Sequence, residues 1–174
     1  MKKIVCILIV ALMLTTAAFA EIQPYTDPEG DIAFSFDTDC FELYMDDVGD
    51  DEHMIILTGT RADWSDCYIR MHLRELDDGE AFPVLADFEE IEKGLNTKAK
   101  QSDWNGFTDV IMYEIDTADD FEQVFIVPVR DDDGEIEDIL TINAFADKLE
   151  DEDAGMSRDD AISAVLDTLK VLED

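Results

Sequence analysis

The stretch Cys67-Tyr68-Ile69-Arg70-Met71-His72-Leu73-Arg74-Glu75-Leu76 alternates strictly between apolar and polar residues. In an extended chain one side would carry Cys67, Ile69, Met71 and Leu73, and the other Tyr68, Arg70, His72 and Arg74. Because successive side chains of a strand point to opposite faces, this pattern predicts a strand with one apolar and one polar face. The polar face is basic, although the 174-residue chain has a formal net charge of −33.

Similar alternation predicts strands over residues 32–36 and 41–45, and an apolar run predicts a central strand over 54–58. Three more strands are predicted over 107–115, 121–130 and 135–145. The turn Asp37-Thr38-Asp39 predicts that 41–45 pairs back on 32–36. Asp-Asp-Gly at 132–134 predicts a hairpin between the last two strands. Residues 21–31 contain two prolines and a glycine, and we expect them to form an irregular lead-in.

Two segments have the spacing of an amphipathic helix. The first places Val84, Phe88, Ile91 and Leu95 on one helical face after Pro83, and the second places Ile162, Val165, Leu169 and Leu172 on one face after a capping-box sequence at 157–160. The element order is then ββββ-α-βββ-α. It predicts an α+β fold, a mostly antiparallel sheet of about six or seven strands with two helices packed on it.

Residues 1–20 have the features of a bacterial-type signal peptide. Lys2 and Lys3 precede an apolar run over 4–14, and Ala18-Phe19-Ala20 fits a cleavage site with small residues. The apolar run is too short to span a membrane. We therefore expect an exported protein, secreted or periplasmic, with one domain over residues 21–174.

The chain has 45 acidic residues and 12 Lys and Arg residues. A surface this negative repels nucleic acid, which excludes it as a partner. A basic protein, a cation or an envelope component stays open as a partner. The alternative is that the charge only keeps an exported protein soluble.

Two cysteines, Cys40 and Cys67, follow the predicted cleavage site, and each opens a predicted strand. In an exported protein an even pair of cysteines favours a disulfide. By closing the loop between them, this bond would stabilise the folded protein by roughly 3 kcal/mol. The alternative is a pair of buried thiols.

The basic stripe of the opening strand, formed by Tyr68, Arg70, His72 and Arg74, is a candidate anion or carboxylate site, because arginine binds such groups in a fork geometry. The alternative is that a helix covers this face or that acids of neighbouring strands pair with it.

An acidic run after residue 45 is a candidate calcium site, with Asp46, Asp47, Asp50, Asp51 and Glu52 as oxygen ligands. The run does not have the spacing of a known calcium loop. Calcium is therefore an alternative, and no other cofactor is expected.

No catalytic motif is recognisable. The two histidines lie on different predicted elements, and neither a phosphate-binding glycine loop nor a nucleophile elbow occurs. Paired carboxylates could catalyse hydrolysis, but 45 acids do not single out a pair. We expect no enzyme activity and keep a small carboxylate hydrolase as the weaker alternative.

The sequence resembles the PsbP-like superfamily of small exported α/β/α domains in three places. Phe34-Ser35-Phe36 with Phe41-Glu42-Leu43 looks like the opening aromatic hairpin of the family, Gly106 like the glycine after its central helix, and 162–169 like its closing helix. The resemblance implies a non-catalytic binding or assembly module with no active site to transfer. We therefore expect an acidic exported binding module.

Overall fold

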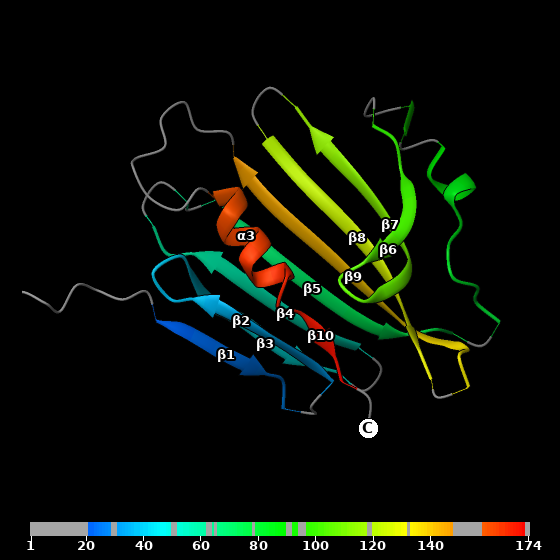
Figure 1. The fold of residues 1–174 in the computed structure, drawn as a ribbon, viewed down its shortest axis with the longest axis horizontal. Coiled ribbons are helices and arrows are strands. Elements are labelled where there is room, and N and C mark those ends of the chain that lie inside the picture. The colour runs from blue at the N-terminus through cyan, green and yellow to red at the C-terminus, as the bar shows by residue number, and fades with distance from the viewer. Residues whose placement is uncertain are drawn as a thin grey trace, which may run out of the picture.

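The computed structural model of the protein describes residues 21–28, 31–49, 52–61, 64, 66–77, 79–89, 92–93, 97–117, 120–131, 133–147 and 158–172. The elements of this part of the chain are ten β-strands in two antiparallel sheets, one α-helix and one 3-10 turn (Figure 1). The predicted α+β fold with two helices packed on one sheet is therefore wrong, and the protein is mostly β. The predicted signal peptide, residues 1–20, lies outside the described residues.

The large sheet has seven strands in the order β3-β4-β5-β9-β8-β7-β6. Their bounds are β3 (Phe41–Val48), β4 (Glu52–Gly59), β5 (Tyr68–Glu75), β6 (Lys100–Trp104), β7 (Phe107–Asp116), β8 (Asp120–Arg130) and β9 (Ile136–Asp147). The strand predicted from the opening stretch is confirmed as β5, and its residues Ile69, Met71 and Leu73 are buried.

The small sheet consists of β1 (Ile22–Thr26), β2 (Ile32–Asp37) and β10 (Lys170–Val171), in the order β1-β2-β10. Together with the helix α3 (Arg158–Leu166) it lies over one face of the large sheet (Figure 1). We call this face the inner face. One apolar core fills the space between the layers, with buried residues from β2, from α3 and from the large sheet.

A row of opposed residues crosses the inner face from β6 to β4. Cross-strand partners share a face of an antiparallel sheet, and the row is Lys100, Met112, Phe125, Ile142, Met71 and Ile55. The last four of these are buried, and each contributes about 1.5–3 kcal/mol by leaving water. The row ends in an exposed lysine at the β6 edge of the sheet.

The predicted helix around residues 84–95 is replaced in its first part by a single 3-10 turn, η2 (Leu85–Phe88). Phe88 is buried, with its ring centroid 5.7 Å from that of Tyr113, whereas Val84 is 58 % exposed. The described residues after this turn, 89 and 92–93, are helical as predicted. Ile91 and Leu95 lie outside the described residues.

The predicted hairpin between β2 and β3 is also wrong, because the two strands belong to different sheets. The amide of Asp39 donates to the Asp37 carboxylate at 2.8 Å, and that of Cys40 to the Asp37 carbonyl at 3.0 Å. This turn carries the chain from the small sheet into the large one. The supposed lead-in contains β1, and the predicted final helix ends at Leu166 and is followed by β10.

Candidate ligand-binding pocket

In the part of the chain that the structure describes, a pocket of about 420 Å³ lies between α3 and strands β6 to β8 on the inner face. We call it the α3 pocket. Its volume falls within the range of about 300–1,000 Å³ that is usual for small-molecule sites.

The floor of the α3 pocket is apolar. Met112 and Phe125 are cross-strand partners on β7 and β8, and Trp104 lies beside them with its ring centroid 4.5 Å from that of Phe125. Leu166 of α3 forms part of the wall. An aromatic and sulfur-containing surface of this kind binds an apolar chain or ring by exclusion of water and by dispersion.

A tight turn fixes the helix beside the pocket. Asn105 and Gly106 connect β6 to β7 with φ angles of 48° and 89°, the positive values that a two-residue type I′ hairpin requires. The Asn105 side-chain amide donates to the carbonyl of Leu166 at 3.0 Å and to that of Leu169 at 2.8 Å. The Leu166 carbonyl ends α3 and also accepts the Leu169 amide at 3.2 Å, and Leu169 lies in the segment that follows the helix. The hairpin therefore anchors the end of α3 and the segment after it.

The rim of the pocket is polar and carries both signs of charge. Lys98 and Lys100 come from the chain entering β6, Glu114 from β7 and Asp167 from the end of α3. The Glu114 carboxylate accepts a hydrogen bond of 3.2 Å from the Gln123 amide on β8. The pocket thus combines an apolar floor with a few polar groups at its mouth, which is the usual arrangement of a small-molecule site.

A second cluster of titratable groups joins the two sheets. The ring of His53 on β4 has Nε2 2.7 Å from an Asp46 oxygen on β3 and Nδ1 3.2 Å from an Asp27 oxygen in the loop after β1. The side chains of His53 and Asp27 are 4 % and 0 % exposed. The Tyr25 hydroxyl donates to the other Asp46 oxygen at 2.6 Å, and its pKa is raised by burial and by Asp46. His53 and Asp27 are buried between the layers, and Asp46 and Tyr25 link them to the more exposed end of the cluster.

The predicted anion stripe lies on the outer face of β5, and its members already have partners. His72 contacts Glu52 at 2.8 Å, and Arg74 forms a two-pronged ion pair with Glu80 at 2.6 and 2.9 Å. The other two members behave similarly, since Arg70 donates to the Asn143 side chain at 2.9 Å and Tyr68 stacks on Phe145. An external anion would have to displace these partners, so the stripe has few donors left for it. The anion site stays a prediction.

The structure separates the calcium candidates that it describes. Asp46 points to the inner face and binds His53 and Tyr25, while Glu52 contacts His72 on the outer face. Asp47 is exposed, and Asp50 and Asp51 lie outside the described residues. Within the described ranges, no group of three or more His, Cys, Asp or Glu side chains is placed to hold a metal ion.

Cys40 and Cys67 are both buried and are present as thiols. Their carbonyls accept hydrogen bonds from Thr60 and Gly59 respectively, so the end of β4 lies between them. Two strand spacings amount to roughly 10 Å, whereas bonded cysteines need Cα atoms within about 7 Å. Burial and Asp37 raise the pKa of Cys40 to about 11, against the opposing effect of Arg61. The disulfide stays a prediction that this arrangement does not favour.

A second hollow, of about 340 Å³, lies where β10 meets the β8–β9 hairpin. Asp31, Asp131, Asp133 and Asp138 line it together with Val171. Burial, followed by the charges of Glu137, Glu75 and Asp31, raises the pKa of Asp138. The lining of the hollow is mostly acidic, like the surface around it. The acidic lining therefore does not mark a specific site.

Sequence reasoning missed the α3 pocket. Its residues come from segments up to 70 positions apart, and the sequence pattern predicted no strand over residues 100–104. The one local signal was the Asn105-Gly106 pair, which marks a hairpin and so indicates a strand before it as well as after it.

Comparisons with known proteins identify no relative. No protein-family model, no curated protein and no solved structure matches this chain. In the part of the chain that the structure describes, no helix is long and apolar enough to cross a membrane.

Proposed function

We propose that this protein is a non-catalytic binding module that takes the apolar group of a small ligand into the α3 pocket. The observation that carries the proposal is the α3 pocket as the described residues form it, where Trp104, Met112 and Phe125 make an apolar floor under a polar rim. The segment 1–20 adds the expectation that the protein acts after export, in the envelope or outside the cell.

Burial of apolar surface supplies the affinity in this proposal. Each methylene group that leaves water contributes about 0.8 kcal/mol. A chain of about eight carbons is therefore sufficient for measurable binding, even after the cost of immobilising the ligand. The pocket is of a size that such a chain would fill.

Two neighbouring positions of α3 provide a matched test. Ser163 and Ala164 are both exposed, and Ser163 lines the pocket whereas Ala164 is not among the lining residues. We expect 1-octanol to bind saturably in a calorimetric titration and to change the emission of Trp104. Ser163→Phe fills the pocket and should weaken binding at least about tenfold, while Ala164→Phe adds the same ring elsewhere and should change it by less than about twofold.

The proposal fails if octanol shows no saturable binding, or if the two variants weaken binding equally. A urea unfolding curve for each variant separates loss of binding from loss of folding, because both substitutions leave the buried helix face unchanged.

A further inference from the structure

We propose that the ligand of the α3 pocket is a small amphipathic monocarboxylate, with its chain or ring on the floor formed by Trp104 and Phe125 and its carboxylate at Lys98 and Lys100. This inference rests on the proposed function and adds the chemical class of the ligand to it.

The first argument is position. Lys100 is the cross-strand partner of Met112, so it projects from the same face as the pocket floor and ends the apolar row. Lys98 lies two residues earlier and also lines the pocket. A lysine stem can lie along apolar surface while its ammonium group stays at the mouth. Both cations are thus placed where the polar end of a bound chain would emerge.

The second argument is the lack of acidic partners. Three basic side chains elsewhere have an acidic partner: Arg74 pairs with Glu80 at 2.6 Å, Arg130 with Asp109 at 3.1 Å and Lys93 with Glu89 at 3.5 Å. Among the residues that the structure describes, no carboxylate forms an ion pair with Lys98 or Lys100. In a chain with 45 acids, two neighbouring cations without such a partner mark a place for an anion from outside.

The third argument concerns the number of charges on the ligand. Glu114 and Asp167 also lie at the rim, so the two lysines and two acids cancel there. The Glu114 carboxylate is directed to Gln123 on the next strand. A single negative charge at the lysine side is favourable in this setting. A second negative charge would meet the acids and the field of the whole protein, with its net charge of −33.

Three probes with the same chain and different heads test the inference: octanoate, 1-octanol and octylammonium, titrated calorimetrically at low salt. Exposed ion pairs are weak, so we expect octanoate to bind about fivefold more tightly than octanol. The double variant Lys98→Gln/Lys100→Gln should remove this advantage, so that it binds octanoate no more tightly than it binds octanol. Glu114→Gln should tighten octanoate binding.

Lys93→Gln/Lys170→Gln is the matched control, because it removes the same charge from exposed lysines that do not line the pocket. It should affect octanoate binding less than about twofold. The inference is overturned if octanoate binds no more tightly than octanol, if octylammonium competes with octanoate for the pocket at equal affinity, or if the control weakens octanoate as much as the pocket variant. Octanol binding that Ser163→Phe blocks would then still support the proposed function, whereas failure of every probe would remove both.

Discussion

The imidazole of His53 has a carboxylate oxygen opposite each ring nitrogen, and the two carboxylates belong to different layers. Asp46 is part of the large sheet, while Asp27 is held in the loop of the small sheet, where its other oxygen accepts the Ile32 amide at 2.8 Å. The Nε2 atom lies at hydrogen-bond distance from Asp46, whereas Nδ1 and Oδ2 of Asp27 lie within ion-pair distance of each other without hydrogen-bond geometry. Removing the ring takes away the contact that each carboxylate makes with His53.

Replacement of His53 by phenylalanine should destabilise the protein strongly. The ring shape is kept, but the hydrogen bond to Asp46 and the contact with the buried Asp27 are lost, and a buried polar group left without its partner costs about 1–3 kcal/mol or more. The midpoint of urea-induced unfolding measures this loss. His72→Phe is the control, since His72 pairs with Glu52 at a more exposed position and should cost no more than about 1 kcal/mol.

A second substitution separates charge from packing. If the buried charge of Asp27 causes the loss, Asp27→Asn should recover part of the stability in the His53→Phe background, because the asparagine oxygen can still accept the Ile32 amide. Equal losses in His53→Phe and His72→Phe would show that the cluster does not hold the sheets together.

The ionised carboxylate of Asp138 lowers the stability of the folded protein, whereas the His53 cluster raises it. Burial and three neighbouring acids raise its pKa in the folded protein above the ordinary value of about 4. The folded state then binds this proton more tightly than the unfolded chain does. The carboxylate therefore lowers stability above the folded-state pKa, and this penalty disappears as the pH falls below the unfolded value.

Asp138→Asn should accordingly raise the thermal midpoint at pH 7 and give no gain near pH 3. Asp103→Asn removes one negative charge from an exposed position on β6 and corrects for the change in net charge. Equal gains from the two variants at pH 7 would assign the effect to general repulsion instead of the surroundings of Asp138.

At the scale of elements, the β6–β7 hairpin and α3 depend on one side chain. Asn105 adopts the positive φ of the turn and also donates to two carbonyls at the end of α3. The same residue thus closes the hairpin, holds the helix and sets one wall of the α3 pocket.

Asn105→Gly keeps the turn conformation and removes both hydrogen bonds. We expect a loss of about 1–3 kcal/mol, with faster amide exchange in α3 and weaker octanol binding. Asp109→Gly is the control, because Asp109 also has a positive φ, of 61°, but pairs with Arg130 at the surface. A result in which Asp109→Gly accelerates exchange in α3 as much would contradict the assigned role of Asn105.

The strands of the large sheet were predictable wherever one face is buried. In β5 the alternation of Ile69, Met71 and Leu73 with polar residues directly reflects a core side and an outer side. The strand β1 was not predictable, since its residues are almost all exposed and Pro24 suits an edge strand. Local alternation also carries no record of which sheet a strand joins, and for this reason the pairing of β2 with β3 was predicted wrongly.

The candidate site was less predictable than the strands. The pocket depends on the register of β6, β7 and β8 and on the place where α3 ends. A short strand with mostly exposed residues, such as β6, gives no periodic signal, so neither Lys100 nor Trp104 could be placed on a common face from the sequence.

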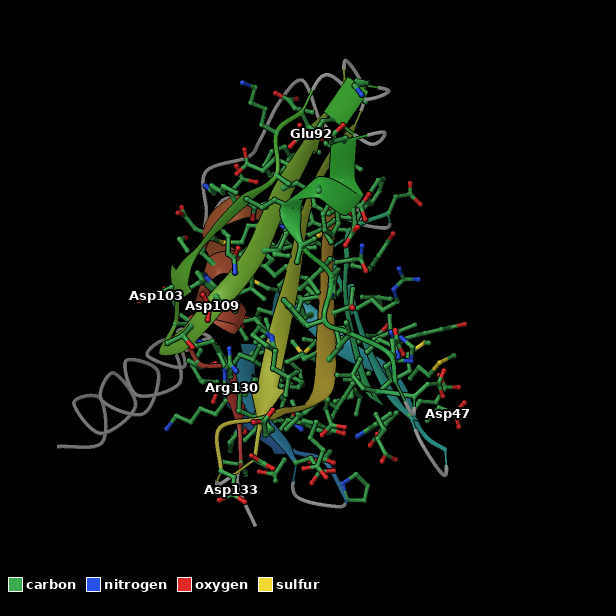
Figure 2. The ribbon with its side chains drawn as sticks, turned by 90° about the vertical axis from the view of Figure 1, so that its right-hand side faces the viewer. Asp47, Glu92, Asp103, Asp109, Arg130 and Asp133 are labelled. Carbon is green, nitrogen blue, oxygen red and sulfur yellow. The ribbon has the colours of Figure 1, made fainter. Side chains whose placement is uncertain are left out.

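For the molecule as a whole, the negative charge is spread over the surface. Figure 2 shows Asp47, Glu92, Asp103 and Asp133 at widely separated places around the fold. This spread protects the open edge of the large sheet, where β3 exposes Leu43, Tyr44 and Met45 between acidic residues. Repulsion between copies opposes edge-to-edge pairing of this strand.

The same repulsion acts within one molecule and is reduced by salt. We expect sodium chloride to raise the thermal midpoint of residues 21–174, and calcium chloride at equal ionic strength to raise it equally, because Asp46 and Glu52 of the candidate calcium run have partners on different faces. A larger rise with calcium would indicate a specific site that binds the native state. Substitution of Asp50 and Asp51 by asparagine would then show whether that site includes the part of the run outside the described residues, and loss of the calcium-specific rise would assign it there.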